Sequence, residues 1–425
     1  RRTLLNSVHS MPGEEPTREK MGWTFDGGMV TMESYLMNFD AINTYKKYLQ
    51  DLIDAQEPNG HIPPIVPTNG WGFLELDESG KRVPILYDDP WWGGTIFFVT
   101  DKLLEFTTDT AVVRQAYPAA KAYADFVRGT AEDHIVSWSL GDWLDLTHGS
   151  KGWGPGLTPV EQTSTAASYY FCRRTAAYAK LLGRQGDAEM YSQYAGTIKQ
   201  VFNEQFFDPQ TGWYANNSQT AQALPLYLGL VPEGEEQRVA NRLMDAIKTN
   251  DFHTSVGFVG VNPLLKYLSE NGQLSTAYRM VTQEESPGWL HFVRDKKSTM
   301  GENLNAQGYG TSHHPFAINV GFWLYYYLGG IQVDFTKDIG IILQPGFETE
   351  LEWVECSYDS LYGKITSNWK KEKGQIIYSV ELPPNQEALL KLPAGFELEG
   401  RSELERYGEG VVIPPGMYEL IIKAS

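Results

Sequence analysis

The hydrophobic pattern changes its period once along this chain of 425 residues, near residue 334. Before that point apolar side chains recur at helical spacing, as in the stripe formed by Val113, Tyr117, Ala120, Ala124 and Val127. After Ile331 the pattern alternates with a period of two, as in Leu351–Cys356. We therefore predict a mainly α chain with two domains, a helical domain at 1–333 and an antiparallel β-domain at 334–425.

Helix-sized blocks fill most of the first domain. Thr158, Pro159 and Glu161 predict a helix start, with Thr158 as N-cap, Pro159 at the first helical position and Glu161 completing a capping box. This helix is expected to run to about Leu182. The other helices are predicted at Met29–Gln56, Thr95–Phe106, Asp187–Glu204, Gln219–Leu230, Gly234–Lys248, Pro263–Glu270, Leu274–Thr282 and Pro315–Gly329.

Three long loops rich in Gly, Pro and Trp separate some of these helices, at His61–Pro90, Ser137–Thr158 and Ser286–His314. Loops of this length usually carry function. Many helices joined by loops of uneven length favour an antiparallel double ring with a site at one end. An α-solenoid is the alternative, but it requires a repeat of fixed period, which the sequence does not contain.

The β-domain shows a hairpin signal, because two β-rich runs, Lys364–Lys370 and Ile376–Leu382, flank Lys373-Gly374. Ala388–Leu392 and Tyr418–Lys423 are predicted to add further strands.

Charge and composition exclude several classes of function. The net charge of −18 argues against nucleic acid and anionic membranes as partners, because phosphate binding needs a basic surface. The longest apolar run, Gly321–Leu328, is too short to cross a membrane. Two cysteines, Cys172 and Cys356, exclude a disulfide framework. The chain contains no phosphate-binding loop, nucleophile elbow or dinucleotide fingerprint, so no cofactor is implied.

A first candidate site is an acidic segment before the long helical blocks. It contains Glu14, Glu15, Glu19 and Asp26 within 13 residues, beside Trp23. Acid–base catalysis needs carboxyl groups in different environments, and desolvation by a neighbouring Trp favours the neutral form of a Glu. The alternative is a solvated charged loop.

A second candidate site lies in the loop before the last predicted helix. Glu302 is an isolated acid that would suit activation of water, with His313 or His314 orienting a substrate. The alternative is a surface or helix-capping Glu. Adjacent histidine side chains diverge and no third ligand follows at metal spacing, so we predict no metal here.

A third candidate site combines aromatic and acidic residues in Gly-rich loops. Trp92 follows Asp88-Asp89-Pro90, and Asp142 and Trp143 lie in Trp138–Asp145. Sugar sites place ring faces on Trp and hydroxyls on carboxylates, although core packing explains the same residues equally well. Trp289 in the third long loop is a further candidate for sugar contact.

Together and in order, these motifs resemble the bacterial α-L-rhamnosidases of glycoside hydrolase family 78. Arg18–Asp26 is similar to the REKxGWxxD signature of that family. The resemblance covers nearly the whole chain, since it continues through Pro90–Gly93, Leu140–Asp145, Leu157–Pro159, Ser218–Gln222, Ser298–Glu302 and Tyr358–Lys364.

The resemblance implies an (α/α)6 barrel followed by a small antiparallel β-sandwich. It also implies an inverting exo-glycosidase that hydrolyses terminal α-L-rhamnosides of oligosaccharides, polysaccharides or glycosides, with Glu19 as general acid and Glu302 as general base. A carbohydrate is the implied partner, with no cofactor. Family members usually carry further β-domains before the barrel, so the chain is expected to be part of a longer protein. The implied substrate-binding residues are Glu14, Arg18, Trp23, Asp26, Trp92, Asp142, Trp143, Trp289 and His314.

Three positions depart from the family pattern. Glu14-Glu15-Pro16 replaces the usual Asp-Cys-Pro, Gly301 replaces a Trp before the base, and His313 replaces an Asn. All three affect the pocket rather than the acid–base pair, so they bear on the preference for unmodified L-rhamnose. Two alternatives remain: a barrel hydrolase or lyase acting on another 6-deoxy or uronic sugar, and an inactive carbohydrate-binding relative.

Overall fold

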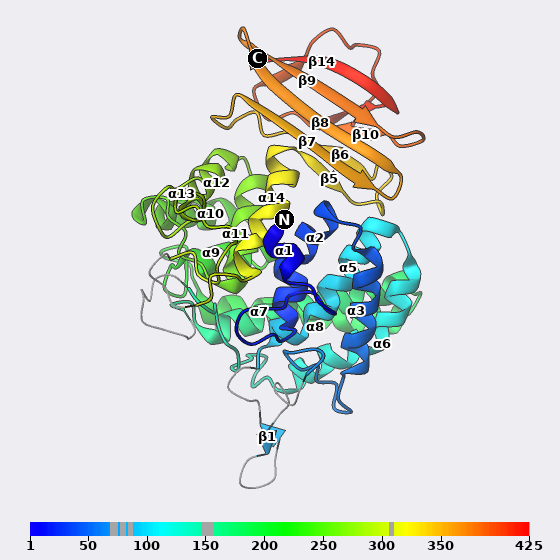
Figure 1. Ribbon diagram of the computed structural model, residues 1–425. Helices are drawn as coiled ribbons and strands as arrows, with labels where there is room; N and C mark the ends of the chain where they lie inside the picture. Colours follow the sequence, from blue (N-terminus) through cyan, green and yellow to red (C-terminus); the bar gives the residue numbers. More distant parts are fainter. Residues whose placement is uncertain (69–74, 77–81, 84–87, 146–155, 306–309, 425) are drawn as a thin grey trace.

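The computed structural model describes residues 1–68, 75–76, 82–83, 88–145, 156–305 and 310–424. A helical domain fills one part of the molecule and a β-domain lies against one end of it (Figure 1). The principal helices are α2 (Met32–Asn38), α3 (Ile42–Asp54), α5 (Thr95–Thr107), α6 (Thr110–Gly129), α7 (Val160–Leu181), α8 (Gln185–Phe206), α9 (Gln219–Leu228), α10 (Glu236–Thr249), α11 (Phe258–Glu270), α12 (Leu274–Val281) and α14 (Val320–Trp323).

Shorter elements join or extend these helices. They are α1 (Arg2–Asn6), α4 (Pro90–Gly93), α13 (Leu290–Arg294), the π-helical turns η1 (Asp26–Val30) and η4 (Leu324–Leu328), the 3₁₀ turn η3 (Phe316–Asn319), and the short strand pairs β1 (Glu75–Leu76) with β2 (Arg82–Val83) and β3 (Phe207–Asp208) with β4 (Trp213–Tyr214).

The helices pack in chain order and the ring closes between its two ends. α5 contacts α3 and α6, and α7 contacts α6 and α8. At the closure, the hydroxyl of Ser34 donates to the carbonyl of Ile318 (2.9 Å) and accepts from the N–H of Phe322 (3.0 Å). Gly321 permits this approach, because a Cβ there would lie 2.9 Å from Ser34 Oγ.

Most predicted helices are confirmed, but several predictions about their extent are wrong, and the helix predicted at Pro315–Gly329 is divided among η3, α14 and η4. Met29–Gln56 is not one helix, since Phe39 takes an extended conformation between α2 and α3. Its ring packs against Tyr35, four residues earlier, and beneath Arg1, which lies outside the helical pattern. α7 takes Pro159 rather than Thr158 as its N-cap, because the hydroxyl of Thr158 hydrogen bonds to that of Ser218 instead (2.7 Å).

The predicted long loops are only partly described. Residues 69–74, 77–81, 84–87, 146–155 and 306–309 of these loops lie outside the described residues. The third loop contains the short helix α13.

The β-domain consists of two five-stranded sheets. One sheet has the order β12-β13-β10-β6-β5 and the other β11-β14-β9-β8-β7. The strands are β5 (Ile331–Val333), β6 (Ile341–Leu343), β7 (Trp353–Ser360), β8 (Gly363–Glu372), β9 (Gln375–Leu382), β10 (Ala388–Leu390), β11 (Phe396–Leu398), β12 (Arg406–Tyr407), β13 (Gly410–Ile413) and β14 (Gly416–Ala424).

The predicted hairpin is confirmed between β8 and β9. Glu372 pairs with Gln375, and both turn residues have positive φ, 50° at Lys373 and 81° at Gly374. Such angles suit the right-handed twist of a two-residue hairpin. One pair departs from the antiparallel expectation: β6 and β10 are parallel, because the chain crosses the other sheet between them. The division at residue 334 stays a prediction; β5 begins at Ile331, just before it.

The β-domain satisfies backbone groups at the end of the helical ring. Trp369 Nε1 donates to the carbonyl of Leu328 (3.1 Å), and the hydroxyl of Ser367 donates to that of Gly329. Both side chains are buried on the inner face of β8. The last carbonyls of a helix have no partner within the helix, so these bonds join the two parts of the chain.

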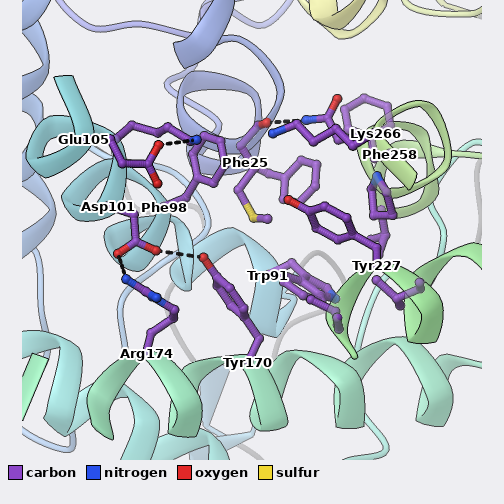
Figure 2. A pocket seen from close by; sticks show the side chains of 17 residues that line it. Phe25, Trp91, Phe98, Asp101, Glu105, Tyr170, Arg174, Tyr227, Phe258 and Lys266 are labelled. Carbon is purple, nitrogen blue, oxygen red and sulfur yellow. Dashed lines mark hydrogen bonds and ion pairs between the residues drawn. The ribbon is translucent and has the colours of Figure 1, made fainter. Parts of the chain in front are cut away.

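A cavity of about 190 Å³ lies inside the helical ring, and four of its charged side chains form two ion pairs, Asp101 with Arg174 and Lys102 with Glu105 (Figure 2). Asp101 accepts from Arg174 Nη2 (2.5 Å) and from the hydroxyl of Tyr170 (3.1 Å). Nearby, Glu33 on α2 binds Lys102 (3.0 Å) and Lys266 (2.7 Å), which come from α5 and α11. Burial opposes ionisation of Glu33, but the two lysines lower its pKa to about 2.

We expect Glu33→Gln to lower the free energy of unfolding by about 3–5 kcal/mol, because both buried lysines lose their common counter-charge. Asp51→Asn is the matched control, since Asp51 pairs with the exposed Lys47 on the surface of α3 and its loss should cost only about 0–1 kcal/mol. Urea unfolding of the three proteins measures both changes. Equal losses in the two variants would contradict the assigned role of Glu33.

The pH dependence of this difference follows from the lowered pKa of Glu33. The stabilisation is fully present above the pKa of an unfolded Glu, about 4.3, and is lost as the pH falls toward about 2. The difference in free energy of unfolding between wild type and Glu33→Gln should therefore decrease as the pH falls from about 4.3 to about 2.

Candidate active site

Glu19 lies in the irregular segment between α1 and η1. Its carboxylate accepts from Trp23 Nε1 at 2.7 Å and contacts Arg18 Nη2 at 2.9 Å. The side chain is a quarter exposed, so a substrate can reach it. The acidic segment predicted as a candidate site is thus an ordered turn, with its Glu and Trp directed at each other.

Glu302 is held by the loop that precedes η3. Its backbone N–H donates to the carbonyl of Thr311 (3.0 Å), and the N–H of Thr311 donates to Oε2 (2.9 Å). Gly310 has a φ of 141°, and a Cβ there would lie 2.8 Å from Oε2. The loop therefore needs a glycine at this position to wrap around the carboxylate, whose side chain is only 3% exposed.

Arg18 joins the two acids. Its Nη1 and Nη2 each lie 3.2 Å from an oxygen of Glu302, and Nη2 also contacts Glu19. The same Nη2 atom therefore contacts both carboxylates. The nearest oxygens of Glu19 and Glu302 can be separated by no more than the sum of these two distances. Residues separated by 283 positions in the sequence converge on one guanidinium.

Asp26 and His314 complete the polar cluster. His314 Nδ1 lies 3.8 Å from Asp26 Oδ1, and its Nε2 lies 4.0 Å from Glu302 Oε1. Burial, together with the charges of Glu302 and Glu19, raises the pKa of Asp26 well above its ordinary value. Burial lowers the pKa of His314, although Glu302 acts in the opposite direction. A protonated Asp26 can donate one hydrogen bond and accept others, whereas a neutral His314 accepts from the N–H of Phe316 at Nδ1 (3.2 Å) and can donate from Nε2.

A layer of stacked rings lies next to this cluster. Phe25 stacks on Trp92 (4.5 Å between centroids), and Phe258 lies 6.0 Å from Trp92 and 4.1 Å from Phe316. His314 meets Phe258 edge-on. Trp92 is 2% exposed, so it belongs to the packed interior of this layer. Phe25 and Phe258 also line the cavity inside the ring (Figure 2).

Asp142 and Trp143 position Phe258. The buried carboxylate of Asp142 accepts from the N–H groups of Gly257 (2.8 Å) and Gly260 (3.0 Å), and from the hydroxyl of Thr220. The N–H of Phe258 donates to the carbonyl of Trp143 (2.9 Å). These bonds fix the start of α11, which begins five residues before the predicted Pro263.

Two predicted substrate contacts have partners away from the acid pair. Glu14 binds His9 Nδ1 at 2.5 Å, and Trp289, 3% exposed, donates its Nε1 to the carbonyl of Ala317 at 3.0 Å. Their substrate-binding roles stay predictions.

Sequence reasoning did not single out Phe258 or Phe316. Phe316 is an ordinary apolar residue of a predicted helix, and Phe258 lies before the helix predicted at Pro263, so only their tertiary placement distinguishes them.

Among the described residues, no cluster of three or more His, Cys, Asp or Glu side chains has the arrangement of a metal site. Within the same residues, no helix is long and apolar enough to span a membrane.

Comparison with known proteins places this geometry in a family. Residues 1–328 match the bacterial alpha-L-rhamnosidase 6 hairpin glycosidase domain, and residues 340–406 match the C-terminal domain of the same enzymes. The chain belongs to the bacterial α-L-rhamnosidase family. The predicted fold, a six-hairpin helical barrel followed by a β-domain, is therefore confirmed.

Individual rhamnosidases are similar over nearly all of the chain. Two curated alpha-L-rhamnosidases from Formosa agariphila are 28% and 23% identical to it over 92% and 99% of its length. The structure of the alpha-L-rhamnosidase from Dictyoglumus thermophilum has a TM-score of 0.86 and 28% identity over 99% of this chain and 48% of its own. The enzyme from Streptomyces avermitilis, complexed with L-rhamnose, has a TM-score of 0.84 and 23% identity over 99% of this chain and 40% of its own, which shows a common fold.

The chain spans about half the length of the curated rhamnosidases it matches, 47% of one and 42% of another.

We expect the imidazole of His314 to remain neutral down to a pH below about 6.5, the ordinary value, because burial lowers its pKa. An NMR titration of labelled histidines measures this midpoint, with the His314→Gln variant identifying the signal. A midpoint at or above about 6.5 would contradict the assignment.

Proposed function

We propose that this chain is the catalytic portion of an exo-acting glycosidase that hydrolyses terminal α-L-rhamnosides of oligosaccharides, polysaccharides or glycosides with inversion. The contact of Glu19 and Glu302 with one guanidinium is the observation that carries the proposal. Glycoside hydrolysis uses two carboxyl groups that flank the scissile bond, and here two acids from distant loops meet beside a stacked aromatic layer. Membership of the rhamnosidase family supports the choice of sugar.

In this mechanism Glu302 removes a proton from water while Glu19 protonates the glycosidic oxygen. Glu302 suits the base because Arg18 and the N–H of Thr311 stabilise its carboxylate form. Glu19 suits the acid because a quarter of its side chain is exposed, so a leaving group can reach it, and Arg18 stabilises the charge left after proton transfer. An inverting pair needs about 6.5–9.5 Å between the carboxyl groups to admit water, and here both carboxylates contact the guanidinium of Arg18.

Other residues of the cluster orient the sugar. Asp26 Oδ1 is buried and has no hydrogen-bond partner among the described residues, so it is available to a sugar hydroxyl. His314 lies between Asp26 and Glu302, where it can contact a neighbouring hydroxyl. Trp23 holds Glu19 and adds an aromatic surface beside it.

We expect Glu19→Gln to reduce kcat on a rhamnosyl disaccharide by about 10²–10⁴-fold, because a poor leaving group needs the proton. The loss should be much smaller for an aryl rhamnoside with a good leaving group. Steady-state kinetics on both substrates measure the contrast. Glu204→Gln, an exposed change on α8, should leave both rates unchanged. Near-wild-type hydrolysis of the disaccharide by Glu19→Gln would remove Glu19 from the acid role.

We expect the first sugar product to have the β configuration, because water attacks the face opposite the leaving group. Proton NMR of the anomeric signal during early turnover measures this, and a panel of aryl glycosides identifies the preferred sugar. An α product would indicate retention. An unsaturated, ultraviolet-absorbing product would indicate a lyase instead.

A further inference from the structure

Glu15, the neighbour of the predicted binding residue Glu14, is fully buried and makes an unusual set of hydrogen bonds. Its Oε1 accepts from the N–H of Thr17 (3.0 Å) and from the hydroxyl of the same residue. Its Oε2 accepts from the N–H of Arg18 and from that of Glu19 (3.2 Å). Three successive backbone amides therefore point at one carboxylate.

These hydrogen bonds close a turn that contains Glu19 and Arg18, the arginine that contacts both acids. The N–H of Lys20 donates to the backbone carbonyl of Glu15 (2.9 Å), and Lys20 itself has a φ of 57°. A left-handed conformation is unfavourable for a lysine and persists only where surrounding contacts enforce it. The side chain and the carbonyl of Glu15 together fix the backbone from residue 17 to residue 20.

The charge on Glu15 fits this arrangement. Burial opposes ionisation, but the hydrogen bonds from Thr17, Arg18 and Glu19 lower its pKa overall. A carboxylate that accepts several N–H bonds is stabilised in its charged form, and such bonds are stronger than those between neutral groups.

We propose that Glu15 is a positioning residue, whose carboxylate sets the direction in which Arg18 and Glu19 leave the backbone. The inference rests on the proposed function, in which Glu19 donates the proton and Arg18 contacts both acids. Glu15 does not contact the reacting atoms itself. It acts through the turn, and a displacement of Glu19 by about 1 Å can cost on the order of 10²-fold in rate.

The competing explanation is that Glu15 only stabilises the fold. The dependence of the rate on the leaving group distinguishes this explanation from a positioning role. Loss of stability alone would lower the rates on all substrates by one factor. Misplacement of the proton donor lowers the rate chiefly where the leaving group needs a proton.

The test compares Glu15→Gln with wild type on a rhamnosyl disaccharide and on an activated aryl rhamnoside. The side-chain amide of the glutamine retains only one acceptor oxygen, so the two hydrogen bonds accepted by the other oxygen of Glu15 are lost. We expect kcat on the disaccharide to fall by about 10- to 100-fold with little change in KM, and kcat on the aryl rhamnoside to fall less than about threefold. Equal losses on both substrates, or no loss on either, would overturn the inference.

Thr17 supplies a second pair of variants in case Glu15→Gln does not fold. Thr17 is exposed, and Thr17→Ala removes only the hydroxyl donor, whereas Thr17→Ser retains it. We expect a smaller loss with the same leaving-group dependence in Thr17→Ala, and recovery in Thr17→Ser. Identical rates for these two variants would also overturn the inference.

A matched control is Asp208→Asn. Asp208 accepts from the N–H of Gln210 and from the hydroxyl of Thr211 in a surface turn, so it holds a turn as Glu15 does but away from the site. It should leave both rates unchanged. Wild type without activity on any rhamnoside would refute the proposed function, whereas an active wild type with unchanged Glu15→Gln and Thr17→Ala would refute only the positioning role.

Discussion

The site depends on the closure of the helical ring. The hydroxyl of Ser34 binds backbone groups of both η3 and α14, and Asn319 Nδ2 reaches the side chain of Asn262 on α11. Because the first and last helices of the ring meet here, the loops that precede them are brought to the same end of the barrel. The convergence of Glu19 and Glu302 on Arg18 is therefore a consequence of topology, and neither loop could build the pair by itself.

Two groups of buried acids in this barrel show contrasting electrostatics. Glu33 is matched by two lysines, and its charge is fully compensated by neighbours on α5 and α11. Asp26 is buried near Glu302 and Glu19, and burial together with these two charges disfavours its charged form. Losing one partner of a buried ion pair destabilises the fold, so Glu33 and its lysines depend on one another. A buried acid next to other acids, such as Asp26, is typical of sites that act on a ligand.

The sequence predicted those features that depend on local periodicity or on motif order. The stripe from Val113 to Val127 became α6, and the Lys373-Gly374 turn joined β8 to β9 as expected. The break at Phe39 could not be predicted from the apolar pattern, because the ring also packs beneath Arg1, which lies outside that pattern.

Within the candidate site, the acids themselves were predictable from their motifs, but their supports were not. Glu14 and Glu15 are identical residues in adjacent positions, and nothing local indicates that one binds His9 while the other organises the turn of Glu19. Phe258 depends on Asp142, which lies over a hundred residues earlier and holds the start of α11. Such relations arise only when distant segments pack together.

The bonds from Trp369 and Ser367 to the end of the last helix have a consequence for dissecting this molecule. A gene cut after Gly329 would leave the carbonyl oxygen of Leu328 and the new terminal carboxylate of Gly329 without these donors, and water would have to replace them. The helical barrel and the β-domain should therefore be expressed together, and chimeric proteins made from relatives should exchange both domains at once.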